Sequence, residues 1–223
     1  MIRVVVGFDQ RESVAFHTFT QSIIEKVSQP VCIVPLALNA LKGYSEVHTD
    51  GSNTFIYSRF LTPFLCDFAG WAIFADGDMI CRADLGELWA LRDEAKALLC
   101  VKHDYKTKAG EKYLGNRNQD YPRKNWSSLV LWNCGHPAHR VLTPSFVQNQ
   151  SGAYLHRFSW LSDDEIGELP PVWNWLTTEY ADNYQAKLLH YTLGTPCFTD
   201  YAQAPMADEW HAHHRRSQDG MHV

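Results

Sequence analysis

The sequence lacks any long apolar segment. None of its apolar runs approaches the ~20 residues that a membrane-spanning helix needs. Its first residues, Met1 to Val6, read as a β-strand rather than as the apolar core of a signal peptide. We therefore expect a cytoplasmic protein without a transmembrane segment.

Paired cysteines and a basic excess are missing too. The six cysteines form no CxxC pair, which argues against zinc-ribbon and redox motifs and predicts buried, reduced thiols. The 20 Lys and Arg residues stand against 25 Asp and Glu residues, a formal net charge of -5. Nucleic-acid binding through a broad basic face depends on phosphate contacts, so this balance argues against it. It does not exclude an anionic ligand bound through a metal ion.

A glycine-rich phosphate-binding loop is also absent, so a bound diphosphate would need a metal ion and isolated cations to neutralise it. The remaining composition, with 45% hydrophobic and 20% charged residues among 223, is ordinary for a folded enzyme domain. A chain of this length buries about 70% of its unfolded surface. We expect one catalytic domain over 1–205 and a solvated C-terminal tail over 206–223.

Strand-like and helix-like segments alternate along the chain. Strands are predicted at 3–6, 31–36, 71–75, 97–102 and 127–132, and helices at 13–27 and 54–68. This order predicts an α/β fold with a nucleotide-binding βαβ layout. The long charged segment 104–124 is either a candidate lid over a bound ligand or a surface hairpin without a catalytic part.

The segment Asp76-Gly77-Asp78 follows the apolar run 71–75 and carries the clearest chemical signal. Side chains two residues apart on an extended backbone project to the same side, so both carboxylates can reach one cation. Mg²⁺ and Mn²⁺ are commonly held by one or two carboxylates together with substrate phosphates. The pattern predicts a metal-diphosphate site, with a solvated polar turn as the alternative.

The residues around this pair extend the pattern. A predicted helix containing Arg59 precedes it, and an acidic-leucine helix start, capped by Asp84, follows it. This block resembles the family eight glycosyltransferases, the group of glycogenin and the bacterial lipopolysaccharide galactosyl- and glucosyltransferases. Looser similarity covers 127–133, 169–175 and 190–196. The opening of the chain is similar to a bacterial subgroup described only as glycosyltransferase.

The resemblance implies a GT-A-type nucleotide-diphospho-sugar transferase fold, in which helices flank a mixed central sheet. It implies a metal-dependent, retaining transfer of a sugar, a hexose, from a nucleoside diphosphate sugar that is UDP-linked. The cofactor would be Mn²⁺ or Mg²⁺. The acceptor, a saccharide, a lipid-linked glycan or another hydroxyl compound, is left open.

The resemblance also assigns roles to single residues. His190 would complete the metal site with Asp76 and Asp78. Donor binding is predicted for a set of residues near the ends of the strands: Gly7, Phe8, Asp9, Arg11, Arg59, Asp76, Gly77 and Gly194.

A retaining transfer needs a carboxylate nucleophile or a polar group that supports attack on the same face of the sugar. The acidic cluster 163–165 stands where the family carries an Asp-Gln pair that contacts the donor sugar. Asp164 is the first candidate, Asp163 the second, and Glu165 the third. An acidic helix cap before Ile166 is the alternative.

Two departures from the family pattern matter. Thr195-Pro196-Cys197 replaces the family's Lys-Pro-Trp, so the lysine that would meet the diphosphate is missing. Lys187, Lys102 or the pair Arg215-Arg216 are the predicted replacements. On the acceptor side, Trp126-Ser127-Ser128 replaces Asn-Ser-Gly.

Two other functions remain open at this point. A metal-dependent nucleotidyltransferase or pyrophosphorylase also uses acidic metal ligands on an α/β fold, although it usually carries a glycine-rich activating loop, and 7–12 has one glycine. A non-catalytic protein that binds nucleotide sugars would have kept the fold after losing the lysine.

Overall fold

The computed structural model describes residues 1–107, 110–115, 120 and 122–219. The larger of two sheets has the strand order β2-β1-β3-β6-β5-β7. Its strands are Ile2–Phe8 (β1), Val31–Ala37 (β2), Trp71–Ala75 (β3), Leu98–Cys100 (β5), Leu129–Asn133 (β6) and Ile166–Glu168 (β7). The smaller sheet has the order β4-β9-β8, with Met79–Cys81 (β4), Leu188–His190 (β9) and Trp175–Leu176 (β8).

The strand directions confirm the predicted mixed sheet. β1 runs parallel to β2 and β3, β6 runs antiparallel to β3 and β5, and β7 runs parallel to β5. As a result β1, β2, β3, β5 and β7 all end at one edge of the large sheet. Open α/β sheets bind their ligands at this edge.

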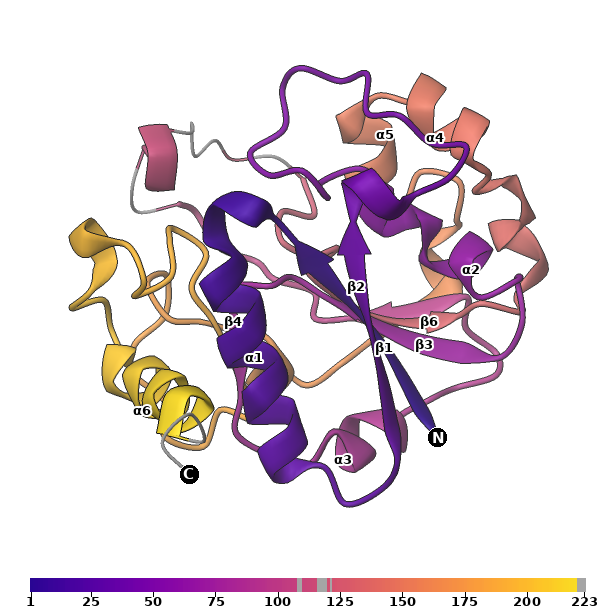
Figure 1. Cartoon of the computed structure of the whole chain (residues 1–223). Coiled ribbons are helices and arrows are strands. Elements are labelled where there is room, and N and C mark those ends of the chain that lie inside the picture. The colour runs from indigo at the N-terminus through magenta and orange to yellow at the C-terminus, as the bar shows by residue number, and fades with distance from the viewer. Residues whose placement is uncertain (108–109, 116–119, 121, 220–223) are drawn as a thin grey trace.

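Helices cover both faces of the large sheet. Val4 and Ile73 pack with α1 (Ser13–Lys26), whereas Val5 and Phe74 share the opposite core with α4 (Pro144–Asn149) and α5 (Gly152–His156). Figure 1 shows α1 and α4–α5 on different sides of the molecule. Because both faces are buried, β3 reads as a continuous apolar run and not as an alternating pattern.

The short helix α3 (Leu85–Trp89) begins as predicted, because the Asp84 side chain accepts a hydrogen bond from Gly86 N at 2.8 Å. The prediction of one helix over 54–68 is wrong. Ser58–Leu61 forms a 3₁₀ turn, and only Thr62–Leu65 (α2) is α-helical. The helix stops there because Asp67 and Phe68 adopt left-handed φ angles of 54° and 51°.

The prediction of a solvated C-terminal tail is also wrong for the described residues. α6 (Ala207–Asp219) packs against α1 (Figure 1), and Trp210 and His213 are each only 2% exposed. Trp210 is the only large apolar residue of this helix. An apolar face made by one tryptophan with alanines and histidines has too little periodic signal to be read from sequence.

No helix in the described part of the chain combines the length and the apolar character needed to cross a bilayer. Part of the predicted lid, residues 108–109, 116–119 and 121, lies outside the described residues.

Candidate active site

The carboxylate pair follows β3 at the edge where the parallel strands end. The Asp76 amide donates to the Ser128 carbonyl at 2.9 Å, which continues the pairing of β3 with β6. Asp78 lies directly before β4, and its carbonyl accepts from Tyr191 N at 3.0 Å. β4 pairs antiparallel with β9, which ends at His190, so the small sheet carries the imidazole to the two carboxylates.

The structure brings the three predicted metal ligands together. One ligand atom from each of Asp76, Asp78 and His190 lies within 4.8 Å of the others. His190 Nε2 is 3.3 Å from Asp78 Oδ1 and 4.0 Å from Asp76 Oδ2.

A buried amide determines which imidazole nitrogen faces the carboxylates. Asn174 Nδ2 donates to Ser128 Oγ at 2.8 Å, so Asn174 Oδ1 is turned toward His190 and accepts from its Nδ1 at 2.9 Å. With the proton on Nδ1, the lone pair of Nε2 points toward the carboxylates. Metal-binding histidines are commonly oriented by such a partner.

The electrostatics of the pair fit a divalent cation. Asp76 Oδ1 and Asp78 Oδ1 are buried and accept no well-directed hydrogen bond from the described residues. Burial, as the largest effect, and the charge of Asp78 together raise the pKa of Asp76 to about 6 against the opposing effects of Arg59 and His190. Burial is also the largest single effect on Asp78, but the interactions with His190 and with the charge of Lys112 together lower the pKa of that carboxyl. A bound divalent ion would offset the repulsion between the two carboxylates.

Arg59 lies beside the pair, but the protein itself uses its guanidinium. Arg59 Nη1 is 2.7 Å from Asp76 Oδ1 and donates to Ser127 O at 3.1 Å, while its Nε donates to Ile56 O at 2.9 Å. The side chain is only 5% exposed. We infer that Arg59 chiefly holds Asp76 in position.

A small cavity of about 60 Å³ opens onto the triad. Besides the triad and Arg59, polar side chains dominate its wall: Ser52, Asn53, Lys112, Asn125, Ser127, Ser128, His156 and Thr192. Ser127 Oγ lies 2.7 Å from His156 Nδ1, and Asn53 Oδ1 is buried without a hydrogen-bond partner among the described residues. No role was predicted for Lys112, Asn125 or His156, because a single polar residue in a loop or short helix has no local signature.

Gly7 and Gly77 lie where the surrounding atoms leave no room for a side chain. A Cβ on Gly7 would lie 2.3 Å from the ring of Phe55, and a Cβ on Gly77 would lie 2.5 Å from the carbonyl oxygen of Gly7. Phe55 therefore occupies the space beside Gly7 in which a close approach of the nucleotide was expected. Gly194 closes a turn by donating from its amide to Tyr191 O at 3.0 Å.

The other predicted donor-binding residues near β1 contact one another or the core. Asp9 Oδ2 accepts from Arg11 Nη2 at 2.6 Å and from Thr54 N at 3.0 Å, so its carboxylate is already hydrogen-bonded. Arg11 Nη2 also donates to the carbonyl of Ser52, a residue of the cavity wall, at 3.1 Å. Phe8 packs edge-on against Phe16, with ring centroids 5.4 Å apart.

The predicted catalytic acids lie away from the triad. Residues Asp163–Glu165 form a 3₁₀ turn directly before β7, and Glu165 closes a capping box with Ser162. The strand register aligns Ile166, the first residue of β7, through β5 and β6 with Ala72 near the start of β3. At about 3.3 Å per residue, the turn before Ile166 therefore lies about 13 Å or more from Asp76, measured along the strand direction. The structure does not bring these acids to the metal ligands, because β7 enters the sheet from the opposite edge.

The predicted replacement cations are also elsewhere. Lys187 pairs with Glu87, Arg216 pairs with Glu25 of α1, and Lys102 lies over the ring of Trp126. None of these three side chains lines the cavity at the triad.

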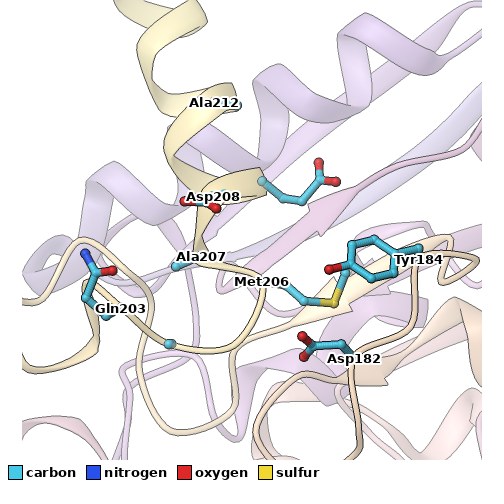
Figure 2. Close-up of a pocket in the computed structure, with 9 residues that line it drawn as sticks. Asp182, Tyr184, Gln203, Met206, Ala207, Asp208 and Ala212 are labelled. Carbon is cyan, nitrogen blue, oxygen red and sulfur yellow. The ribbon is translucent and has the colours of Figure 1, made fainter.

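A second, larger cavity of about 560 Å³ lies at the start of α6, and none of the triad lines it. Figure 2 shows Asp182 and Tyr184, from the segment after β8, near Met206. Three carboxylates line this cavity, those of Asp182, Asp208 and Glu209. Glu209 pairs with Arg82 at 3.3 Å.

Comparison with solved structures shows that the fold of this chain is similar to glycosyltransferase folds. No protein-family model matches the chain. Protein CDI of Arabidopsis thaliana is 45% identical over 217 residues, covering 93% of this chain and 84% of that protein.

Three solved structures share the fold at low sequence identity. The bifunctional glycosyltransferase WbbM matches with a TM-score of 0.68 at 16% identity, over 96% of this chain and 49% of its own. The galactosyltransferase LgtC, solved with donor and acceptor sugar analogues, matches with 0.62 at 12%, over 96% of both chains. GlyE of Streptococcus pneumoniae matches with 0.62 at 16%, over 96% of this chain and 61% of its own. This chain thus spans about half of WbbM and nearly all of LgtC.

Proposed function

The chain belongs to the family of Arabidopsis Protein CDI, and from this premise and its glycosyltransferase fold we propose that it is a metal-dependent glycosyltransferase. It moves a sugar, a hexose, from a UDP-linked donor to a hydroxyl acceptor. The sequence blocks support a place in family eight. The expected bacterial subgroup has no support from the relative, which is a plant protein.

The observation that carries the proposal is the triad of Asp76, Asp78 and His190 at the ligand-binding edge of this fold. Two carboxylates and one oriented imidazole suit Mn²⁺, since its ligand preferences include both oxygen and imidazole nitrogen. When bound, such an ion would stabilise the negative charge that develops on the leaving diphosphate. The protein's own part is to hold the three ligands in place, through Arg59 at Asp76 and Asn174 at His190.

The side chains of the cavity wall limit which groups could control the anomeric configuration of the product. Among the described residues that line it, Asp76 and Asp78 are the only carboxylates, and we assign both to the metal. The catalytic role proposed for Asp163, Asp164 and Glu165 therefore has no geometric support. We propose retention by same-face attack, with Asn125 and Ser127 as the polar groups beside the sugar.

Calorimetry with a panel of nucleoside diphosphates, with and without Mn²⁺, tests the proposal. We expect UDP to bind with Mn²⁺ and to lose at least about tenfold in affinity in excess EDTA, because the metal bridges the diphosphate. Asp78→Asn should abolish turnover and keep the fold. Asp164→Asn is the matched control, an exposed acid distant from the triad, and should remain active. Equal UDP affinity in EDTA would contradict the proposal.

The product's anomeric configuration tests the mechanism separately. An α-linked donor should give an α-linked product, read from NMR coupling constants. A β-linked product would show inversion and would require a base that activates the acceptor from the opposite face.

The missing phosphate lysine favours a second candidate, a non-catalytic protein that binds nucleotide sugars. Donor hydrolysis or transfer separates the two, since such a protein would bind UDP with Mn²⁺ but release no sugar.

A further inference from the structure

Among the described residues, the wall of the triad cavity contains one arginine and one lysine, Arg59 and Lys112. Arg59 is engaged with Asp76 and with two carbonyl groups. Lys112, in contrast, forms no ion pair with a carboxylate in the described part of the chain. Of the two, Lys112 is therefore the cation that remains for a ligand.

Lys112 comes from the segment between β5 and β6, far in sequence from the triad, yet it lies in the field of the metal ligands. Burial lowers the pKa of its ammonium, and the charges of Asp78 and Asp76 oppose that effect. Glu179 adds a further negative charge, and Arg59 acts in the opposite sense. The ammonium thus shares the cavity with both carboxylates without being paired to either.

The charges of the cavity wall balance only if Lys112 is counted. The wall carries two carboxylates, Asp76 and Asp78, and two cationic side chains, Arg59 and a protonated Lys112, so a divalent metal ion would match the two negative charges of a nucleoside diphosphate sugar. Cleavage of the donor adds negative charge to the leaving diphosphate. A cation beside that diphosphate is then needed more in the transition state than in the ground state.

We propose that Lys112 binds the diphosphate of the donor and replaces, from a different part of the fold, the lysine missing at 195–197. This inference rests on the proposed function, since it assigns a contact within the same site. It differs from the cations predicted from sequence, Lys187, Lys102 and Arg215-Arg216.

Inorganic pyrophosphate and UDP, each titrated with saturating Mn²⁺, test the contact without knowledge of the sugar. We expect Lys112→Gln to weaken binding of both about 10- to 100-fold, the effect of losing a charged hydrogen bond. Lys112→Arg should keep most of the affinity, because it keeps the charge. Lys187→Gln, which removes a lysine paired with Glu87, is the matched control and should bind like the wild type.

Binding of Mn²⁺ alone separates a phosphate contact from a structural role. Loss of a positive charge near two carboxylates should leave the Mn²⁺ affinity of Lys112→Gln unchanged or higher, whereas a damaged site would lose affinity for metal and pyrophosphate together. Parallel loss of both, or unchanged pyrophosphate affinity in Lys112→Gln, would overturn the assignment. A wild-type protein that binds neither pyrophosphate nor UDP with Mn²⁺ would instead overturn the proposed function, and this inference with it.

Discussion

Asn174 is the residue on which the geometry of the proposed metal site most directly depends. It is fully buried and joins His190 on one side to Ser128 on the other through its amide group. An imidazole without this acceptor could turn over or place its proton on Nε2, and either change would remove the lone pair from the carboxylates.

We therefore predict that Asn174→Ala lowers Mn²⁺ affinity about 10- to 100-fold, the usual effect of losing a ligand's hydrogen-bond partner. Calorimetric titration of Mn²⁺ measures it directly. Asn149→Ala, which removes an exposed side chain of α4 whose amide donates to the carbonyl of Ser145, is the control. Wild-type metal affinity in Asn174→Ala would show that the ring is held by its strand alone.

Among the elements, α6 has the least expected position. Its Trp210 joins Ile80, Leu189 and Tyr191 in a small core on the face of β4 and β9 that is opposite His190. The helix thus supports the ligand-bearing strands from behind. Near the C-terminus of α6, Arg216 forms an ion pair with Glu25 of α1, with 2.9 Å between Arg216 Nη2 and Glu25 Oε2.

This contact predicts a pH dependence. The hydrogen bond from Arg216, opposed by partial burial, lowers the pKa of Glu25 to about 2. A carboxyl with a depressed pKa stabilises the folded state above its unfolded pKa of about 4.3 and loses that contribution as the pH falls toward 2.

Urea unfolding of Glu25→Gln should therefore show a loss of about 0.5–1 kcal/mol at pH 7, the upper range for a solvent-exposed pair. The difference from the wild type should shrink between pH 4 and pH 2. Glu87→Gln, which breaks the more exposed pair with Lys187, should cost less. A difference for Glu25→Gln that stays constant down to about pH 2 would contradict the ionic origin of the effect.

At the scale of the whole molecule, the triad joins two sheets. Asp76 follows β3 of the large sheet, whereas Asp78 directly precedes β4 and His190 ends β9, both in the small sheet. A ligand bound across this junction would stabilise only the folded chain, in which the two sheets meet.

We predict that Mn²⁺ and UDP together raise the melting temperature more than either one alone. At 100 times the dissociation constant, binding adds about 2.7 kcal/mol, which corresponds to about 5–10 °C for a domain of this size. Differential scanning fluorimetry measures the shift. Asp78→Asn should remove the joint effect, and an equal shift in that variant would mean that binding does not require the triad.

Local patterns in the sequence were enough for five strands of the large sheet, β1, β2, β3, β5 and β6, and for the carboxylate pair. The apolar run before Asp76 marks a strand buried on both faces, and two acids spaced by one residue must point to the same side of an extended backbone. His190 came from the resemblance, and β9 carries it to the pair. The cap at Asp84 followed from a rule of helix chemistry that needs no distant contact.

The remaining features of the site and the fold depend on how distant segments of the chain pack together. Whether Asp164 could meet the donor depended on the edge at which β7 enters the sheet, and whether Gly7 faced a ligand depended on Phe55. Lys112 reaches the cavity through a long connection, and α6 packs through a single tryptophan. Each of these outcomes depends on contacts between residues distant in sequence, and local periodicity and spacing contain no information about such contacts.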